Sequence, residues 1–204
     1  MDLWELERAC WAQGHGLVCG CDEAGAGPLA GPVYAAAVIL PRELNIPGLN
    51  DSKKLTPKKR DLLYDQIIAQ AQAWAVAWVE PEEIDTTDIL SARMNAMQRA
   101  IDGLNVKPDF ALIDGNRDHG KSGAITTSHA TVVKGDSLSA SIAAASILAK
   151  VSRDRYMEEM AKEYPQYAFE RHKGYPTKLH YERLDQHGPC PIHRKTFLKK
   201  RKKG

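Results

Sequence analysis

The sequence has no apolar run that approaches the ~20 residues needed to span a bilayer. Its first fourteen residues include acidic side chains where a secretory signal peptide would be basic. Its four cysteines are too few for a disulfide scaffold and are not paired with histidines at zinc spacing. These absences predict a soluble, cytoplasmic protein with reduced thiols and without a membrane partner.

A strong net charge is also missing, because 28 Lys and Arg nearly balance 26 Asp and Glu and leave +2. The charge is unevenly distributed along the chain. Residues 191–204 hold seven basic and no acidic side chains, so the remainder has 21 basic against 26 acidic residues. A basic end on an acidic body suits a protein that meets phosphates at one end, although an ordinary solvated tail has the same composition.

No internal repeat, low-complexity linker or composition break interrupts the chain, and we expect one domain over residues 1–204. Short apolar runs bounded by Gly and Pro predict strands, and longer amphipathic or small-residue runs predict helices. The expected strands are residues 17–25, 33–41, 73–80, 109–115 and 124–133, and the expected helices are residues 2–13, 56–70, 82–104 and 134–164. This order predicts an α/β fold in which helices flank a mixed five-stranded sheet, with a helical extension over about residues 165–204.

Four acidic residues fall where a predicted strand ends or a predicted helix begins. Asp22 and Glu23 close the first strand, Asp114 closes the fourth, and Asp136 opens the long helix. Side chains at the strand ends of an open α/β sheet converge on one crevice. Gathered carboxylates repel one another unless cations offset their charge, and their oxygens suit Mg²⁺ or Mn²⁺. Two such ions can clamp a scissile phosphate, so the set predicts metal-assisted phosphodiester hydrolysis.

Each acid also has a simpler interpretation. Asp136 fits a helix N-cap and Asp114 fits a turn residue. Asp22 and Glu23 would point to opposite faces of a regular strand, so their joint use needs a bend at Gly25 or a metal that straddles the strand end. Two charges at the end of an apolar strand are costly to bury without partners, which favours a site.

The glycine-rich loop that follows the first strand permits two interpretations. Gly25, Gly27 and Gly31 have the look of a dinucleotide-binding loop, which would lead into a helix that holds pyrophosphate. Pro28 and Pro32 instead introduce another predicted strand, so a Rossmann-type nucleotide-binding enzyme is the disfavoured alternative. In a nuclease, the glycines let the backbone approach a ribose closely enough to bond its 2′-OH.

Six segments resemble ribonuclease HII, in the family's order: CDEAGAGPLAGPVYAAAVIL, LNDSKKL, LIDGN, VVKGDSLSASIAAASILAKVSRD, HKGYPTKLH and HGPCPIHRKTF. They lie between residues 18 and 197, so the resemblance covers nearly the whole chain. It implies a ribonuclease H-like fold and an endoribonuclease that uses Mg²⁺ or Mn²⁺. The implied substrates are RNA/DNA hybrids and duplex DNA that contains ribonucleotides, cut on the 5′ side of the ribonucleotide to leave 3′-hydroxyl and 5′-phosphate ends. We also expect a monomer.

The same resemblance assigns roles to individual residues. The implied catalytic and metal-binding acids are Asp22, Glu23, Asp114 and Asp136. The implied substrate contacts are Gly25, Ala26 and Gly27 for the 2′-OH, Lys53 and Lys54 for phosphate, and Tyr175 for the sugar. From the residues alone, Tyr175 is an ordinary partly buried aromatic and the two lysines are a solvated pair. His172 and His193 are further candidates for duplex contacts.

Ala26 departs from the family's pattern, which reads Gly-Arg-Gly at this tripeptide. Alanine keeps the backbone groups but removes a guanidinium able to hold phosphate or brace the loop. Two explanations stay open: a natural variant that compensates elsewhere, or an engineered substitution that weakens the enzyme. A nucleic-acid-binding protein without catalysis, based on the basic tail and Tyr175, is therefore a second alternative, although a pure binder would avoid acids facing phosphate.

Overall fold

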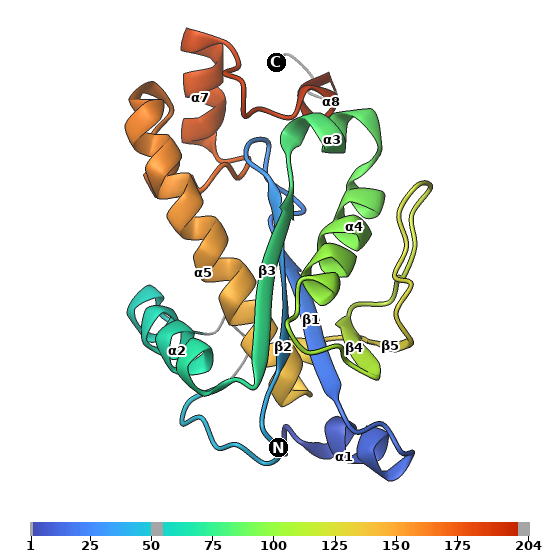
Figure 1. Ribbon diagram of the computed structural model, residues 1–204. Coiled ribbons are helices and arrows are strands. Elements are labelled where there is room, and N and C mark those ends of the chain that lie inside the picture. The colour runs from blue at the N-terminus through green and yellow to red at the C-terminus, as the bar shows by residue number, and fades with distance from the viewer. Residues whose placement is uncertain (1, 50–54, 200–204) are drawn as a thin grey trace.

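The structure is a computed structural model that describes residues 2–49 and 55–199. Its strands are β1 Val18–Ala24, β2 Val33–Ile39, β3 Ala73–Val79, β4 Phe110–Asp114 and β5 His129–Val132. They form one five-stranded sheet in the order β3-β2-β1-β4-β5 (Figure 1). The β1–β2 and β2–β3 pairs are antiparallel, whereas β1–β4 and β4–β5 are parallel. The predicted mixed sheet is confirmed.

The helices are α1 Glu5–Ala12, α2 Pro57–Gln70, α3 Pro81–Thr86, α4 Ile89–Asp102, α5 Ala140–Glu163, α6 Phe169–His172, α7 Lys178–His187 and α8 Lys195–Lys199. Two 3₁₀ turns accompany them, η2 Gly135–Ser137 and η3 Pro165–Tyr167. The predicted start of α2 is confirmed, since the Thr56 hydroxyl accepts from the Lys59 N–H and Pro57 occupies the first turn. No helix within the described ranges combines the length and hydropathy of a membrane span.

Helices cover both faces of the sheet, so its central strands are apolar on both sides. Every residue of β2 is buried, because alternate side chains enter two different cores. Val33, Ala35 and Ala37 pack in the core on the α4 side, whereas Ala36 and Val38 pack in the core that α5 and α2 complete. Figure 1 shows α5 and α2 on one side of the strands and α4 on the other.

Three predicted elements differ most from the structure. The predicted helix 82–104 is broken into α3 and α4, because the extended Asp88 accepts from two backbone N–H groups and begins a new helix. The predicted strand 124–133 is only β5, since the Thr126 and Thr127 N–H groups bond Gln98 Oε1 instead of a neighbouring strand. The predicted helix 134–164 starts at Ala140, as described below.

The segments after α5 pack against the loop that joins β1 to β2. Leu29 and Ala30 of that loop share a buried cluster with Tyr167, Phe169 and Leu184. The C-terminal pieces, among them α7 and α8, lie at the opposite end of the molecule from α1 (Figure 1). The predicted helical extension therefore covers the glycine-rich loop and supports it from behind.

Gly20 allows α5 to approach β1 closely, and this contact gives a testable stability effect. A Cβ at Gly20 would lie 2.1 Å from the Ser141 carbonyl carbon, which is helix backbone and cannot rotate away. We expect Gly20→Ala to lower the unfolding free energy by about 1–3 kcal/mol or more, measured by urea denaturation. Gly27→Ala is the matched control, because its Cβ would meet only Tyr175 Cε1 at 3.9 Å. Equal stability of the two variants would contradict this account.

Candidate active site

The acids of β1 and β4 end side by side at one edge of the sheet. Because β1 and β4 are parallel and Cys21 pairs with Ile113, the following residues, Asp22 and Asp114, occupy matching positions. A hollow of about 220 Å³ opens there. Its lining consists of Asp22, Glu23, Ala24, Gly25, Ala26, Gly27, Asp114, Ser146, Lys150 and Tyr175. Three of the four predicted acids, the predicted tripeptide and Tyr175 thus surround one space.

Asp136 is not among the described residues that line this hollow, but the turn that contains Asp136 is hydrogen-bonded to one of them. The Gly135 N–H donates to Asp114 Oδ1 at 2.7 Å, which holds η2 against the end of β4. Lys134 has a positive φ of 57° and turns the chain before η2. The prediction that Asp136 opens the long helix is wrong, because the Ser139 hydroxyl caps α5 by accepting from the Ile142 N–H. The interpretation of Asp136 as the N-cap of this helix is therefore also wrong.

Two of the four acids are strongly desolvated. Asp22 is 4% exposed and Asp136 is 5% exposed, and removing a carboxylate from water costs free energy. The Glu23 N–H donates to Asp22 Oδ1 at 2.7 Å. Glu23 Oε1 forms an ion pair with Arg93 Nη2 at 2.7 Å, so a cation from α4 reaches the site from the opposite face of the sheet to α5.

The chemistry of these donors fits a hard divalent cation, since all of them are carboxylate oxygens. Within the described ranges, however, no three His, Cys, Asp or Glu side chains are already arranged to hold a metal ion. The Arg93 ion pair already engages one oxygen of Glu23. Metal binding at Glu23 would thus exchange one cationic partner for another.

Tyr175 lies at the rim of the hollow and is 39% exposed, so it is more accessible than an ordinary packed aromatic. The Arg153 guanidinium carbon lies 5.6 Å from its ring centroid, which fits a cation–π contact that holds the ring in place. The predicted contacts Lys53 and Lys54 fall outside the described residues.

Sequence reasoning missed Ser146, Lys150 and Arg153 in α5. They follow the spacing i, i+4, i+7, which places them on one face of a helix that is otherwise small and apolar in this half. That polar stripe is a signal that would have identified them. The Lys150 ammonium bonds Asp154 at 2.6 Å, while burial lowers the pKa of Lys150. Arg93 carried no such signal, because a cation is ordinary in an amphipathic helix.

The two histidines considered as candidates for duplex contacts, His172 and His193, are buried. His172 Nε2 lies 2.9 Å from the Tyr167 carbonyl oxygen, and His193 Nε2 lies 3.0 Å from His180 Nε2. His180 Nδ1 in turn lies 3.0 Å from the Tyr175 carbonyl oxygen. The histidines therefore support the Tyr175 segment from inside the C-terminal extension.

Burial lowers the pKa of His180 and of His193 to about 4, below the ordinary value of 6.5. Both rings are therefore neutral in the fold but take up protons when the chain unfolds below pH 6.5. We expect the unfolding free energy to fall as pH decreases from 6.5 toward 4, and the urea midpoint measured at pH 7 and pH 5 checks this. His180→Asn should reduce that slope, and an unchanged slope in this variant would contradict the account.

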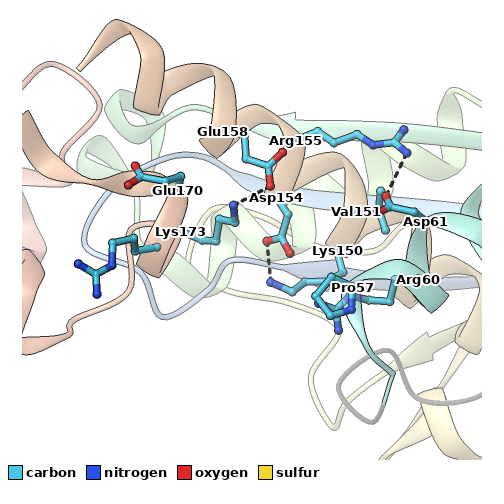
Figure 2. A pocket seen from close by; sticks show the side chains of 11 residues that line it. Pro57, Arg60, Asp61, Lys150, Val151, Asp154, Arg155, Glu158, Glu170 and Lys173 are labelled. Atoms are coloured by element: carbon cyan, nitrogen blue, oxygen red, sulfur yellow. Dashed lines mark hydrogen bonds and ion pairs between the residues drawn. The ribbon is translucent and has the colours of Figure 1, made fainter. Parts of the chain in front are cut away.

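A larger hollow of about 710 Å³ adjoins the site and shares Lys150 with it. Figure 2 shows charged side chains from α2, α5 and the segment after it, three pairs of which face one another. The pairs are Lys150 with Asp154, Arg155 with Asp61, and Lys173 with Glu158. Because these charges are mutually compensated, we place the chemistry in the smaller hollow.

Comparison with known proteins agrees over nearly the whole chain. A family model described as Ribonuclease HII matches residues 19–200. Ribonuclease HII of Caldicellulosiruptor bescii is 50% identical over 198 residues, which cover 97% of this chain and 94% of the relative. Ribonuclease HII of Vibrio parahaemolyticus is 54% identical over 193 residues, which cover 95% and 90%. The crystal structure of ribonuclease H2 from Pyrococcus horikoshii OT3 has a TM-score of 0.73 and 29% identity, covering 88% of this chain and 93% of that one.

Proposed function

This chain belongs to the ribonuclease HII family, and on that premise we propose that it is an endoribonuclease that hydrolyses the RNA strand of RNA/DNA hybrids. The observation that carries the proposal is the single hollow shared by Asp22, Glu23 and Asp114 with the tripeptide of residues 25–27 and Tyr175. Its second substrate is duplex DNA with embedded ribonucleotides, cut on their 5′ side to leave 3′-hydroxyl and 5′-phosphate ends.

The family depends on divalent metal, and for this chain we propose Mg²⁺ or Mn²⁺. When bound, the ions would supply an activated water and offset the charge of the reacting phosphate. The residues that would hold them are Asp22, Glu23, Asp114 and Asp136. Desolvation of Asp22 and Asp136 strengthens their attraction for a cation, because charges interact more strongly away from bulk water.

The remaining residues select and orient the substrate in this proposal. The tripeptide Gly25, Ala26 and Gly27 meets the ribose 2′-OH, and Tyr175 stacks on the neighbouring sugar. Lys53 and Lys54 contact phosphate. We further propose that the chain works in the cytoplasm as a monomer and as one domain over residues 1–204, with an extension from about residue 165.

The first experiment compares cleavage of an RNA/DNA hybrid and of a DNA duplex with one ribonucleotide, each with Mg²⁺, with Mn²⁺ and with EDTA. We expect metal-dependent cuts with 3′-hydroxyl ends, and no cutting in EDTA. The rival binding protein predicts duplex affinity that falls steeply with salt, needs no metal and is accompanied by no cleavage. That second pattern would overturn the proposal.

Ala26 gives a prediction about substrate preference. Ala26 lines the hollow without the guanidinium of the family's pattern. A substrate that offers few ribose contacts should therefore lose the most cleavage rate when this guanidinium is absent. We expect Ala26→Arg to raise cleavage at a single embedded ribonucleotide severalfold relative to cleavage of a long hybrid. Ala26→Lys is the matched control, because it restores a charge without the planar fork. An equal ratio of the two activities in the parent and in Ala26→Arg would defeat the idea.

A further inference from the structure

Two arginines lie fully buried beneath the loop of residues 25–32. Arg153 comes from α5 and Arg194 precedes α8, and neither side chain is exposed to solvent. Their side-chain hydrogen bonds run to backbone carbonyls. Arg194 donates to the carbonyl oxygens of Gly25 at 2.6 Å, Ala26 at 3.0 Å and Gly31 at 2.9 Å. Arg153 donates to those of Ala30 at 3.1 Å, Pro32 at 3.2 Å and Lys173 at 3.0 Å.

Burying two guanidinium groups costs free energy because they lose contact with water, which indicates a role beyond packing. Burial lowers the pKa of Arg194 to about 9, so the guanidinium is desolvated yet still charged at neutral pH. Buried charges are often replaceable by apolar side chains without loss of stability. Apolar groups, however, cannot hold several carbonyls in a set direction, whereas the planar guanidinium fork can.

The direction of the carbonyls determines what the loop presents to the hollow. A trans peptide is planar, with its C=O and N–H groups pointing in opposite directions. When the Gly25 and Ala26 carbonyls turn inward to Arg194, the N–H groups of Ala26 and Gly27 turn away from it. Residues 25–27 line the hollow, so these donors are directed to the substrate side.

The first residue of the loop permits this bend. Gly25 has a φ of +97°, which side-chain-bearing residues rarely adopt, and a Cβ there would lie 2.1 Å from Arg153 Nε. The Tyr175 segment is fixed by related contacts, because Arg153 bonds the Lys173 carbonyl and the Leu29 N–H donates to the Gly174 carbonyl at 2.8 Å. Arg153 and Arg194 therefore brace both substrate-facing elements.

We propose that Arg194, supported by Arg153, is a positioning residue for ribose selection. By holding the Gly25 and Ala26 carbonyls inward, it aims two backbone N–H donors at the 2′-oxygen, which is read as a hydrogen-bond acceptor. This inference rests on the proposed function, because the tripeptide must be the ribose-reading element. It predicts that recognition does not require an arginine at position 26, since the brace comes from elsewhere in the chain.

The test uses the full chain with Arg194→Lys, which keeps the charge and stem but loses the fork. Affinity is measured for two duplexes, one of DNA alone and one with a single ribonucleotide, in Ca²⁺ to limit cleavage. We expect the preference for the ribonucleotide to fall roughly tenfold, the size of one lost hydrogen bond. Arg153→Lys should act in the same direction. Arg171→Lys, an exposed cation of the same extension, is the control that should keep the preference.

A second readout separates positioning from general support. In ¹⁵N-labelled parent protein, the amide signals of Ala26 and Gly27 should differ between the two duplexes, and in Arg194→Lys this difference should vanish. Thermal unfolding confirms that each variant is folded at the assay temperature. If the folded Arg194→Lys keeps both the preference and the amide difference, the inference is overturned. Failure of the proposed function would look different, as the parent itself would cut neither substrate.

Discussion

Asp22→Asn is expected to lower the rate of cleavage roughly 1,000-fold, which corresponds to about 4 kcal/mol of transition-state stabilisation. The amide has the same shape as the carboxylate but carries no charge, so it cannot attract a divalent cation with the same strength. The measurement is single-turnover cleavage of a duplex with one ribonucleotide in saturating Mg²⁺.

The stability of the same variant provides an internal check. Asp22 is 4% exposed, and its carboxylate is costly to bury among like charges. The metal-free Asp22→Asn should therefore be as resistant to thermal unfolding as the parent, or more so. Asp102→Asn, the same chemical change at an exposed position of α4, should alter neither property. Activity of Asp22→Asn within tenfold of the parent would count heavily against the assignment.

Asp136→Asn is expected to lower the cleavage rate by about 100-fold or more while leaving the fold intact. Asp136 lies in η2 beside the end of β4, with its turn bonded to Asp114, and Ser139 caps the helix. Its carboxylate is therefore not needed to begin α5, and in our proposal it helps to hold the metal. Kinetics together with urea denaturation distinguish these two roles.

Ser139→Ala is the complementary variant. Its hydroxyl caps α5 and also donates to the buried Glu7 carboxylate at 2.6 Å. We expect a loss of about 0.5–2 kcal/mol or more of unfolding free energy, with a much smaller change in rate than Asp136→Asn causes. If Asp136→Asn instead destabilised the protein and left the rate unchanged, a structural role for Asp136 would be established and the metal role lost.

The ion pair between Arg93 and Glu23 reduces the net negative charge of the site. The 2.7 Å contact between Arg93 Nη2 and Glu23 Oε1 partly compensates the negative charge of Glu23, which is one of the four predicted acids. Lys150 lines the hollow together with three of the acids, and Arg93 is joined to the hollow through its ion pair with Glu23. Arg93 and Lys150 thus lie close to the acids, and Arg194 donates to the Ala26 carbonyl oxygen from beneath the adjoining loop.

Local sequence patterns by themselves predicted many of the strands, one helix start and the candidate acids. Short continuous apolar runs specify β2 and β3, and Thr56 with Pro57 specifies the start of α2. The acids after apolar strands were identifiable because carboxylates at such positions need compensation. The extent of α5 was misjudged, because Asp136 and Ser139 are both good caps and only the packing against Glu7 and β1 selects between them.

Tertiary structure alone decided which distant groups meet. Gly25 and Arg194 are 169 residues apart, and nothing in the composition around Arg194 says that its guanidinium is buried beneath a loop near the first strand. The same holds for Arg93, which reaches Glu23 across the edge of the sheet. A hydrogen bond to a carbonyl oxygen depends on the direction in which that carbonyl points, and the packed backbone sets this direction. Side-chain chemistry therefore indicated which reaction was possible, and the fold determined where the reacting groups come together.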